Sequence, residues 1–440
     1  MRRTIRKIFV GIGLPQSMSY QIKNSVNVNT RSYFEHFDGR RWWYQPRIDQ
    51  FFNQQDKTVT KDNEPYPIVS MFDILDHPKV QMFLDILTTR IEEQFTRQVK
   101  YPIRARIKTL VVYIHKTNGN LSEFHRNLEY HKETWGPKLG YKRNRETGEI
   151  QIPAYKTLYK FMRKYLGPTI EQQDVELVLF VITEAKKLGI DIDKYIIADS
   201  TPYESSKADY DATVSGHYKM RGYKEQRILS KDTDVPLAYK ITKNTKFDGA
   251  YIRELLEKLL ASGCQPTDFW GDGHYATKEL LPSYWFEYGL HTHFKSKANW
   301  KQIPDITDEI NRVYQKLWKI DGFKPTDDET CTLDFKLRFI WKHTTTDSHR
   351  DLVSNYFVRH IQQWETNIPE IKKRLCNFRQ TIECGFGVEK KFSNFKLMEW
   401  CTFTSWKSVV AIRTLLDWIT SIFWMHNGRT VNLTSTKSIV

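Results

Sequence analysis

Two short apolar segments that each end at an acidic residue constrain the fold of this chain more than any other feature. The first begins at Tyr195 and leads into Asp199, and the second begins at Thr267 and stops at Asp272. Turn-forming residues follow each acid, among them Gly273. Short apolar runs bounded in this way are typical of buried strands. We therefore expect two strands, each presenting a carboxylate at its tip.

From about residue 194 the sequence alternates between strand and helix patterns. Residues 223–229 and 237–241 predict a hairpin, and residues 248–261 predict a helix with Asp248 as its cap. After Asp272, a helical stretch over 278–288 and a strand over 290–294 follow. This is the order of elements expected of a ribonuclease H-like fold. The predicted fold class is therefore α/β, with a mixed sheet flanked by helices.

Helical patterns dominate the chain before residue 190, for example over 79–95 and 105–114. We predict a mainly α-helical N-terminal region over 1–190, a catalytic domain over 191–430 and a tail over 431–440. The stretch from 295 to 347 is longer than the core requires and is interpreted as an inserted subdomain. Within it, residues 333–340 alternate with period two and predict a strand. Residues 136–148, rich in glycine and cations, predict a loop.

The net charge of +15 and the isoelectric point near 9.3 indicate a polyanionic partner, of which nucleic acid is the commonest. The alternative is a solvated basic surface. A helix predicted from Pro153 onward places cations among aromatic residues, an arrangement suited to gripping a DNA backbone. It equally suits an amphipathic helix with solvated lysines. The cations are Lys156, Lys160, Arg163 and Lys164.

The five cysteines include no CxxC pair, so neither a disulfide framework nor a zinc ribbon is expected, and a reducing cytoplasm is the simpler location. The amino terminus lacks a convincing signal-peptide cleavage site. The one strongly apolar long segment, residues 408–425, is interrupted by Arg413 and Asp417 at i,i+4 spacing. A buried helix explains this segment better than a membrane span.

A third acid, Glu383, lies in a segment of helical character that also contains Arg379 and Lys390 on the same face. Two divalent metal ions held about 4 Å apart by carboxylates can activate an attacking oxygen and stabilise a leaving one. Magnesium prefers such oxygen ligands. The ordered set of Asp199, Asp272 and Glu383 therefore predicts a site for metal-dependent phosphoryl transfer.

The segment from Asp199 to Lys390 resembles the catalytic domain of DDE transposases of prokaryotic insertion sequences, in particular the group with a Tyr-Arg-Glu-Lys signature. The match rests on Asp199-Ser-Thr, on Asp272 followed by Tyr275, and on Arg379, Glu383 and Lys390 at the spacing of the signature. It covers roughly the carboxy-terminal half of the chain. One position departs from the pattern, because Cys376 stands where the signature has its tyrosine.

The resemblance implies that Asp199, Asp272 and Glu383 bind two Mg²⁺ or Mn²⁺ ions. It implies hydrolysis at the terminal inverted repeats of a transposon, followed by transfer of the freed 3′-hydroxyl into target DNA. Arg379 and Lys390 would contact DNA. A homodimer in the synaptic complex and a location in the prokaryotic cytoplasm, near the nucleoid, are implied as well. The alternatives are a structure-selective nuclease of the same fold and a transposase-derived DNA-binding protein that has lost catalysis.

Three histidines near the acids receive a more ordinary interpretation. His274, beside Asp272, is expected to form hydrogen bonds within its loop. His291 and His293 alternate on a predicted strand and lack a third ligand at metal-binding spacing, so packing or hydrogen bonding is favoured for them. The neighbouring tryptophans, Trp270, Trp285 and Trp300, are expected to pack in the core or the insertion.

Overall fold

The computed structural model is a mixed α/β structure with a mixed sheet flanked by helices. It describes residues 69–116, 120–216, 219–243, 246–297, 299–321, 332–367, 402–435 and 439. These residues fall into two compact units. The larger unit contains the described residues of 69–267 and 402–439, and the smaller unit contains those of 268–367.

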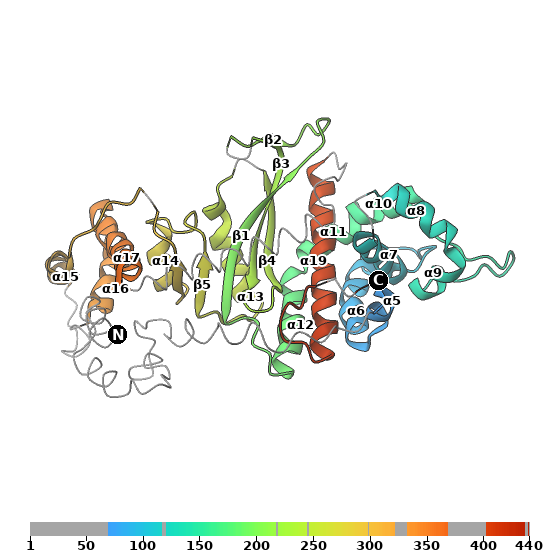
Figure 1. Ribbon diagram of the computed structural model, residues 1–440, viewed down its shortest axis with the longest axis horizontal. Coiled ribbons are helices and arrows are strands. Elements are labelled where there is room, and N and C mark those ends of the chain that lie inside the picture. The colour runs from blue at the N-terminus through green and yellow to red at the C-terminus, as the bar shows by residue number, and fades with distance from the viewer. Residues whose placement is uncertain are drawn as a thin grey trace. The chain divides into compact units, whose positions relative to one another are not determined.

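The amino-terminal part of the larger unit is helical, as the sequence predicts (Figure 1). The helices are α5 (Met71–Asp76), α6 (Pro78–Glu92), α7 (Ile103–Lys116), α8 (Leu121–Tyr130), α9 (Lys132–Leu139), α10 (Tyr155–Phe161), the π-helical turn η1 (Met162–Leu166), α11 (Gly167–Gln172) and α12 (Asp174–Lys187). Proline at the first position of α6 suits a helix start, because its missing N–H group would have no partner there.

One prediction for this region is wrong in part, because α9 covers residues 136–139 of the predicted loop. Gly140, in the left-handed conformation at φ 95°, ends the helix. A short antiparallel bridge between Arg143 and Ile150 then closes a hairpin. Gly136 allows α9 to pack closely, since an added Cβ would lie 2.5 Å from Cγ2 of Ile150. Tertiary packing on Ile150 therefore outweighs the loop-like local composition.

The strands of the larger unit form an antiparallel sheet. They are β1 (Tyr195–Glu204), β2 (Thr213–Val214), β3 (Arg221–Ser230) and β4 (Pro236–Lys243). β3 pairs with β1, β2 and β4, and the hairpin between β3 and β4 is the one the sequence predicts. The single-turn 3₁₀ helix η2 (Asp248–Tyr251) and α13 (Ile252–Ala261) follow where one helix was expected. The residue that precedes α13 is Tyr251, so Asp248 does not cap it.

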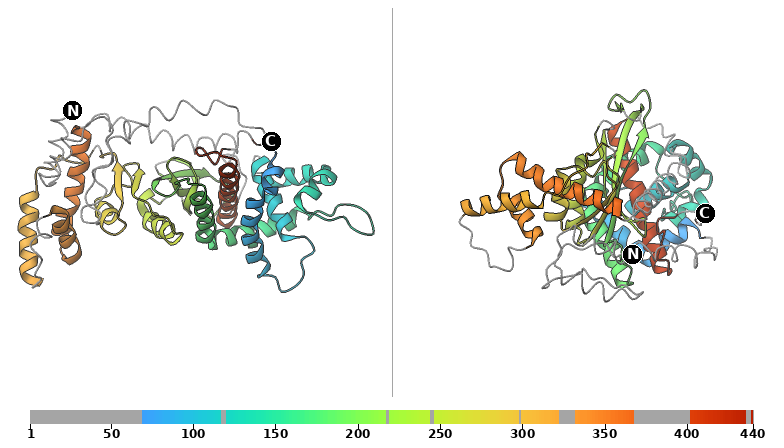
Figure 2. Two further views of the ribbon diagram at one scale, coloured as in Figure 1. Left: turned by 90° about the horizontal axis from the view of Figure 1, so that it is seen from below. Right: turned by 60° about the vertical axis from the view of Figure 1, so that its left-hand side comes forward.

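The core of the larger unit is the C-terminal helix α19 (Phe403–His426). It packs against β4 on one side and against α6, α7, α11 and α12 elsewhere, and Figures 1 and 2 show it between the strands and the helices of this unit. The predicted boundary at residue 190 falls inside this unit, between α12 and β1. α19 is the one described helix that is long and apolar enough to cross a membrane, and its apolar window is wholly buried in the protein. The prediction of a buried helix is confirmed.

The smaller unit begins with a βαβ element, in which α14 (Leu280–Phe286) joins the parallel strands β5 (Asp268–Gly271) and β6 (His291–Phe294). Three helices follow: α15 (Thr307–Asp321), α16 (Leu333–His343) and α17 (Asp347–Asn367). α17 packs against α14, α15 and α16.

The strand predicted over 333–340 is wrong, because this segment is the helix α16. Where every second residue is apolar, residues four positions apart are apolar too. The alternating pattern therefore also fits one face of a helix. Phe335 and Phe339 stack at i,i+4, and both rings contact Tyr314 on α15. Thr332 caps the helix by accepting the N–H of Phe335. The cap and the aromatic contacts favour the helix.

Candidate active site

Asp199 is the fifth of ten residues in β1, not the last, so the prediction of a carboxylate at the strand tip is wrong for this residue. Pairing with β3 continues beyond it as far as Glu204. Ser200 and Thr201 resemble turn residues, but β3 supplies their backbone partners and keeps them in the sheet. Asp199 is half-buried, and its Oδ1 accepts the N–H of Ser200 at 2.7 Å.

A buried group of charges lies on the same face of the sheet as Asp199. Arg227 on β3 is directly opposite Asp199 in the antiparallel register, which directs both side chains to one face. The Arg227 guanidinium donates from Nε to Glu225, two residues away, and its Nη1 lies 3.5 Å from Oδ2 of Asp417 on α19. Arg413 Nη2 lies 3.2 Å from the other oxygen of Asp417. We call Glu225, Arg227, Arg413 and Asp417 the buried charge group.

The buried charge group connects the sheet to α19. All four side chains are at most 6% exposed. Tyr203 on β1 adds a hydrogen bond from its hydroxyl to Glu225 Oε2 at 2.7 Å. The two negative and two positive charges of the group balance each other. Buried ions need such pairing, because it offsets the free-energy cost of removing them from water. The i,i+4 spacing of Arg413 and Asp417 is the one signal of this group in the sequence, and no sequence pattern points to the strand residues Glu225 and Arg227.

Asp272 follows the last residue of β5, so its predicted place at a strand end is confirmed. The carboxylate is 19% exposed, and it accepts the backbone N–H of His274 at Oδ1, at 2.7 Å. Nδ1 of His274 lies 2.7 Å from Oδ2. His274 is therefore hydrogen-bonded within the loop, as predicted. Burial lowers the pKa of Lys297, while the nearby Asp272 carboxylate acts in the opposite direction.

Asp199 belongs to the larger unit and Asp272 to the smaller one. Glu383, Arg379 and Lys390 lie outside the described residues, as does Cys376. Within the described part of the chain, no three or more His, Cys, Asp or Glu side chains form a group that could hold a metal ion.

The donor atoms of the two described acids fit a hard divalent cation. A carboxylate oxygen has two acceptor positions, and each Asp272 oxygen uses one of them towards His274. The Ser200 N–H bond likewise uses one position of Asp199 Oδ1. Oxygen donors of this kind suit Mg²⁺ and Mn²⁺.

The predicted DNA-binding lysines lie along one continuous helical segment. Lys156 and Lys160 on α10 and Lys164 in η1 are exposed, and none of them forms an ion pair with another described residue. Arg163 differs from them, because its Nη1 donates to the hydroxyl of Tyr159 at 3.2 Å and its guanidinium lies 5.3 Å from the centre of that ring. The three lysines are thus accessible to a phosphate backbone, whereas Arg163 packs on the helix.

The histidines of β6 pack and form hydrogen bonds, as predicted. His293 Nε2 lies 2.8 Å from Asp268 Oδ1, and its ring stacks on Trp270 with centroids 4.3 Å apart. His291 contacts the ring of Trp285, whose Nε1 donates to Asp334. These contacts account for Trp270 and Trp285 as packing residues.

In comparisons with known proteins, no family model, curated protein or solved structure matches this chain.

Proposed function

We propose that this chain is a DNA transposase of the DDE type, with a ribonuclease H-like catalytic core. The observation that supports this most is the order of elements around the two described acids. Asp199 lies on the first strand, a hairpin and α13 follow, and β5 leads directly into Asp272 before α14 and β6. The signature residues Arg379, Glu383 and Lys390 add the expected third ligand and two cations in sequence.

The proposed reaction has two steps. In the first, water attacks a phosphodiester at the transposon end, a new P–O bond forms, and the bond to the 3′-oxygen breaks, leaving a 3′-hydroxyl. In the second, this hydroxyl attacks a phosphodiester of the target, and one P–O bond replaces another. Divalent metal ions, when bound, activate the attacking oxygen and stabilise the leaving one. Asp199, Asp272 and Glu383 would hold these ions.

Protein groups around each carboxylate would hold it in place for this task. The Ser200 N–H fixes one oxygen of Asp199, and His274 orients both oxygens of Asp272. Metal ligands supported in this way keep their geometry, and loss of such support commonly weakens metal binding or activity. The exposed lysines of α10 and η1, together with the net charge of +15, would bind the DNA backbone. Two copies of the chain would act on paired transposon ends.

The test is cleavage and joining with purified protein, labelled transposon-end DNA, a target plasmid and Mg²⁺ or Mn²⁺. The end sequence is chosen by sequencing the genomic flanks of the reading frame, where a transposase gene is expected to have inverted repeats. Asp199→Asn should lower cleavage by more than about 100-fold, since it weakens a metal ligand, and should leave end binding intact. Asp232→Asn, at an exposed acid of the β3–β4 turn, is the matched control and should cleave normally.

Each outcome assigns the function differently. Cleaved ends that join the plasmid support a transposase. Cleaved ends that never join would identify a nuclease of this fold, and binding without cleavage would identify a DNA-binding protein that has lost catalysis. Unchanged cleavage by Asp199→Asn would remove Asp199 from the site.

A further inference from the structure

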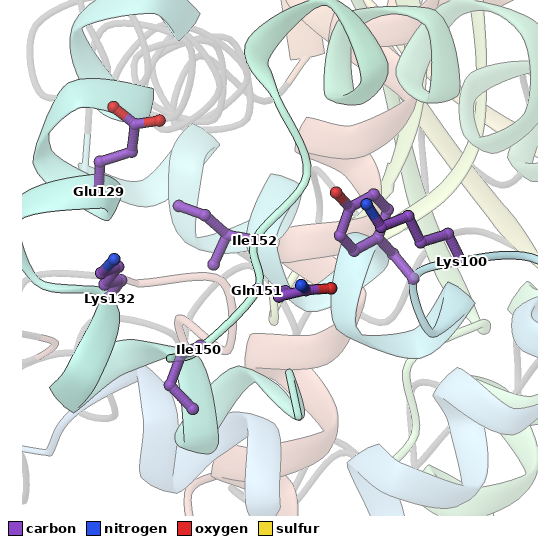
Figure 3. Close-up of a pocket in the computed structure, with 7 residues that line it drawn as sticks. Lys100, Glu129, Lys132, Ile150, Gln151 and Ile152 are labelled. Atoms are coloured by element: carbon purple, nitrogen blue, oxygen red, sulfur yellow. The ribbon is translucent and has the colours of Figure 1, made fainter. Parts of the chain in front are cut away.

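A pocket of about 410 Å³ lies in the helical part of the larger unit, and none of its lining residues is a proposed metal ligand (Figure 3). Its walls come from the segment before α7, the end of α8, the start of α9 and the segment 150–152 that leads from the hairpin to α10. The lining residues are Lys100, Tyr101, Glu129, Lys132, Ile150, Gln151 and Ile152. The volume is in the range of sites for small organic ligands.

The lining combines cations with an apolar surface. Lys100 and Lys132 stand on opposite sides of the segment 150–152 in Figure 3. Lys100 forms no ion pair with any described residue, and its ammonium lies 5.3 Å from the ring centre of Tyr101. Lys132 has only a long contact, 3.5 Å, to Glu149. Both ammonium groups can therefore bind an anion.

The Tyr101 side of the pocket suits a flat heterocycle. The ring of Tyr101 supplies an apolar surface, and the amide of Gln151 supplies two donors and an acceptor, whereas Ile150 is 4% exposed and packs against Gly136. The one acid, Glu129, lies 3.7 Å from His125 Nδ1 in its own helix. His125 also forms a hydrogen bond with the carbonyl of Pro153 at 2.9 Å, which holds the segment beside the pocket in place.

The basic helix follows the pocket residues closely in the chain. Ile152 is only three residues before the first residue of α10, and the exposed Lys156 and Lys160 follow. Tyr130, 84% exposed, neighbours the pocket residue Glu129 in the chain. Cations with interleaved aromatic side chains are the usual composition of surfaces that bind unpaired nucleic acid.

We propose that this pocket binds one unstacked nucleotide, with its base against Tyr101 and Gln151 and its phosphate at Lys100, while Lys132, on the other side of the segment 150–152, binds a neighbouring phosphate of the same strand. This inference rests on the proposed DNA-binding function and assigns a new subsite to it. The nucleotide is either part of a DNA strand that follows the α10 lysines or a free mononucleotide. The helical region would then recognise distorted or single-stranded ends in addition to duplex backbone.

The test compares three labelled DNAs: a matched duplex, the same duplex with one unpaired 2-aminopurine, and the single strand. Wild-type protein should bind the second and third at least about 10-fold more tightly than the first, because a pocket for an unpaired base gains stacking contacts. The 2-aminopurine emission should change on binding. Competition by a free deoxynucleoside monophosphate at micromolar concentration would assign the pocket to the free ligand and overturn the DNA assignment.

Substitutions test whether the preference for unpaired DNA comes from this pocket. Lys100→Gln with Lys132→Gln should abolish the preference for unpaired DNA, and Gln151→Glu, which keeps the size of the side chain, should do the same by repelling phosphate. The matched control, Lys142→Gln with Arg145→Gln, removes two exposed charges from the neighbouring hairpin and should keep the preference. If both double variants lose the preference for unpaired DNA equally, the pocket assignment is overturned. It is also overturned if the wild-type protein binds duplex DNA but shows no preference for unpaired DNA; neither result bears on the proposed function. Protein that binds no DNA at all would overturn the proposed function as well.

Discussion

The buried charge group is predicted to fix the sheet to α19, and Arg227→Met tests this directly. Methionine has a similar length but no charge, so Glu225 and Asp417 lose their shared cation. Glu225 is fully buried and Asp417 is 2% exposed. Breaking a buried ion pair by removing one partner costs about 3–5 kcal/mol. Asp417 keeps Arg413 at 3.2 Å, and Glu225 keeps the Tyr203 hydroxyl at 2.7 Å, so we expect the lower end, about 3 kcal/mol.

Hydrogen–deuterium exchange is the suitable assay, because two compact units need not unfold together. Peptides from β3 and α19 should exchange roughly 100-fold faster in the variant, which corresponds to about 3 kcal/mol. Peptides from α16 and α17 in the smaller unit serve as an internal reference. Arg126→Met, at an exposed cation of α8, is the matched control and should change exchange very little.

A second substitution checks the cause. Adding Glu225→Gln to Arg227→Met removes the uncompensated carboxylate, so the double variant should regain part of the lost protection, about 1–2 kcal/mol. Unchanged exchange in Arg227→Met would refute the idea that these charges join the sheet to α19. Additive losses in the double variant would show that Glu225 and Arg227 act independently.

Two further predictions concern packing and pH. Burial, with Asp232 and Asp417 nearby, raises the pKa of Asp234 to about 6. The native protein then binds this proton more tightly than the unfolded chain, so stability should fall as pH rises from about 4 to about 6. Asp234→Asn, which tolerates the local φ of 61°, should remove that fall in thermal unfolding; an unchanged pH profile would contradict the assignment. Gly167→Ala would place a Cβ 2.6 Å from the Ser408 Cα on α19 and should cost about 1–3 kcal/mol, whereas Gly216→Ala, with open space around it, should not; equal melting temperatures would argue against close contact of α11 with α19.

Local sequence patterns were sufficient for most individual elements. The β3–β4 hairpin, the helices α6 and α7, the strand β6 and the buried helix α19 all lie where apolar periodicity and turn residues predict them. Apolar periodicity predicted the wrong element for α16. Its apolar residues alternate as in a strand, but they also recur every fourth position, as on a helix. Local patterns also failed where partner strands extend an element, as at Asp199, which β3 keeps inside β1.

The sequence by itself determined the chemistry that this chain can offer: two acids beside apolar strands, a third beside two cations, and an excess of positive charge. It could not determine which distant residues meet, because pairing across strands and helices depends on register and packing rather than on local composition. Only the tertiary structure placed Arg227 opposite Asp199 and brought Asp417 on α19, more than 180 residues later, to the buried guanidinium of Arg227. The pocket near Gln151 has the same origin, since four separate segments form its walls.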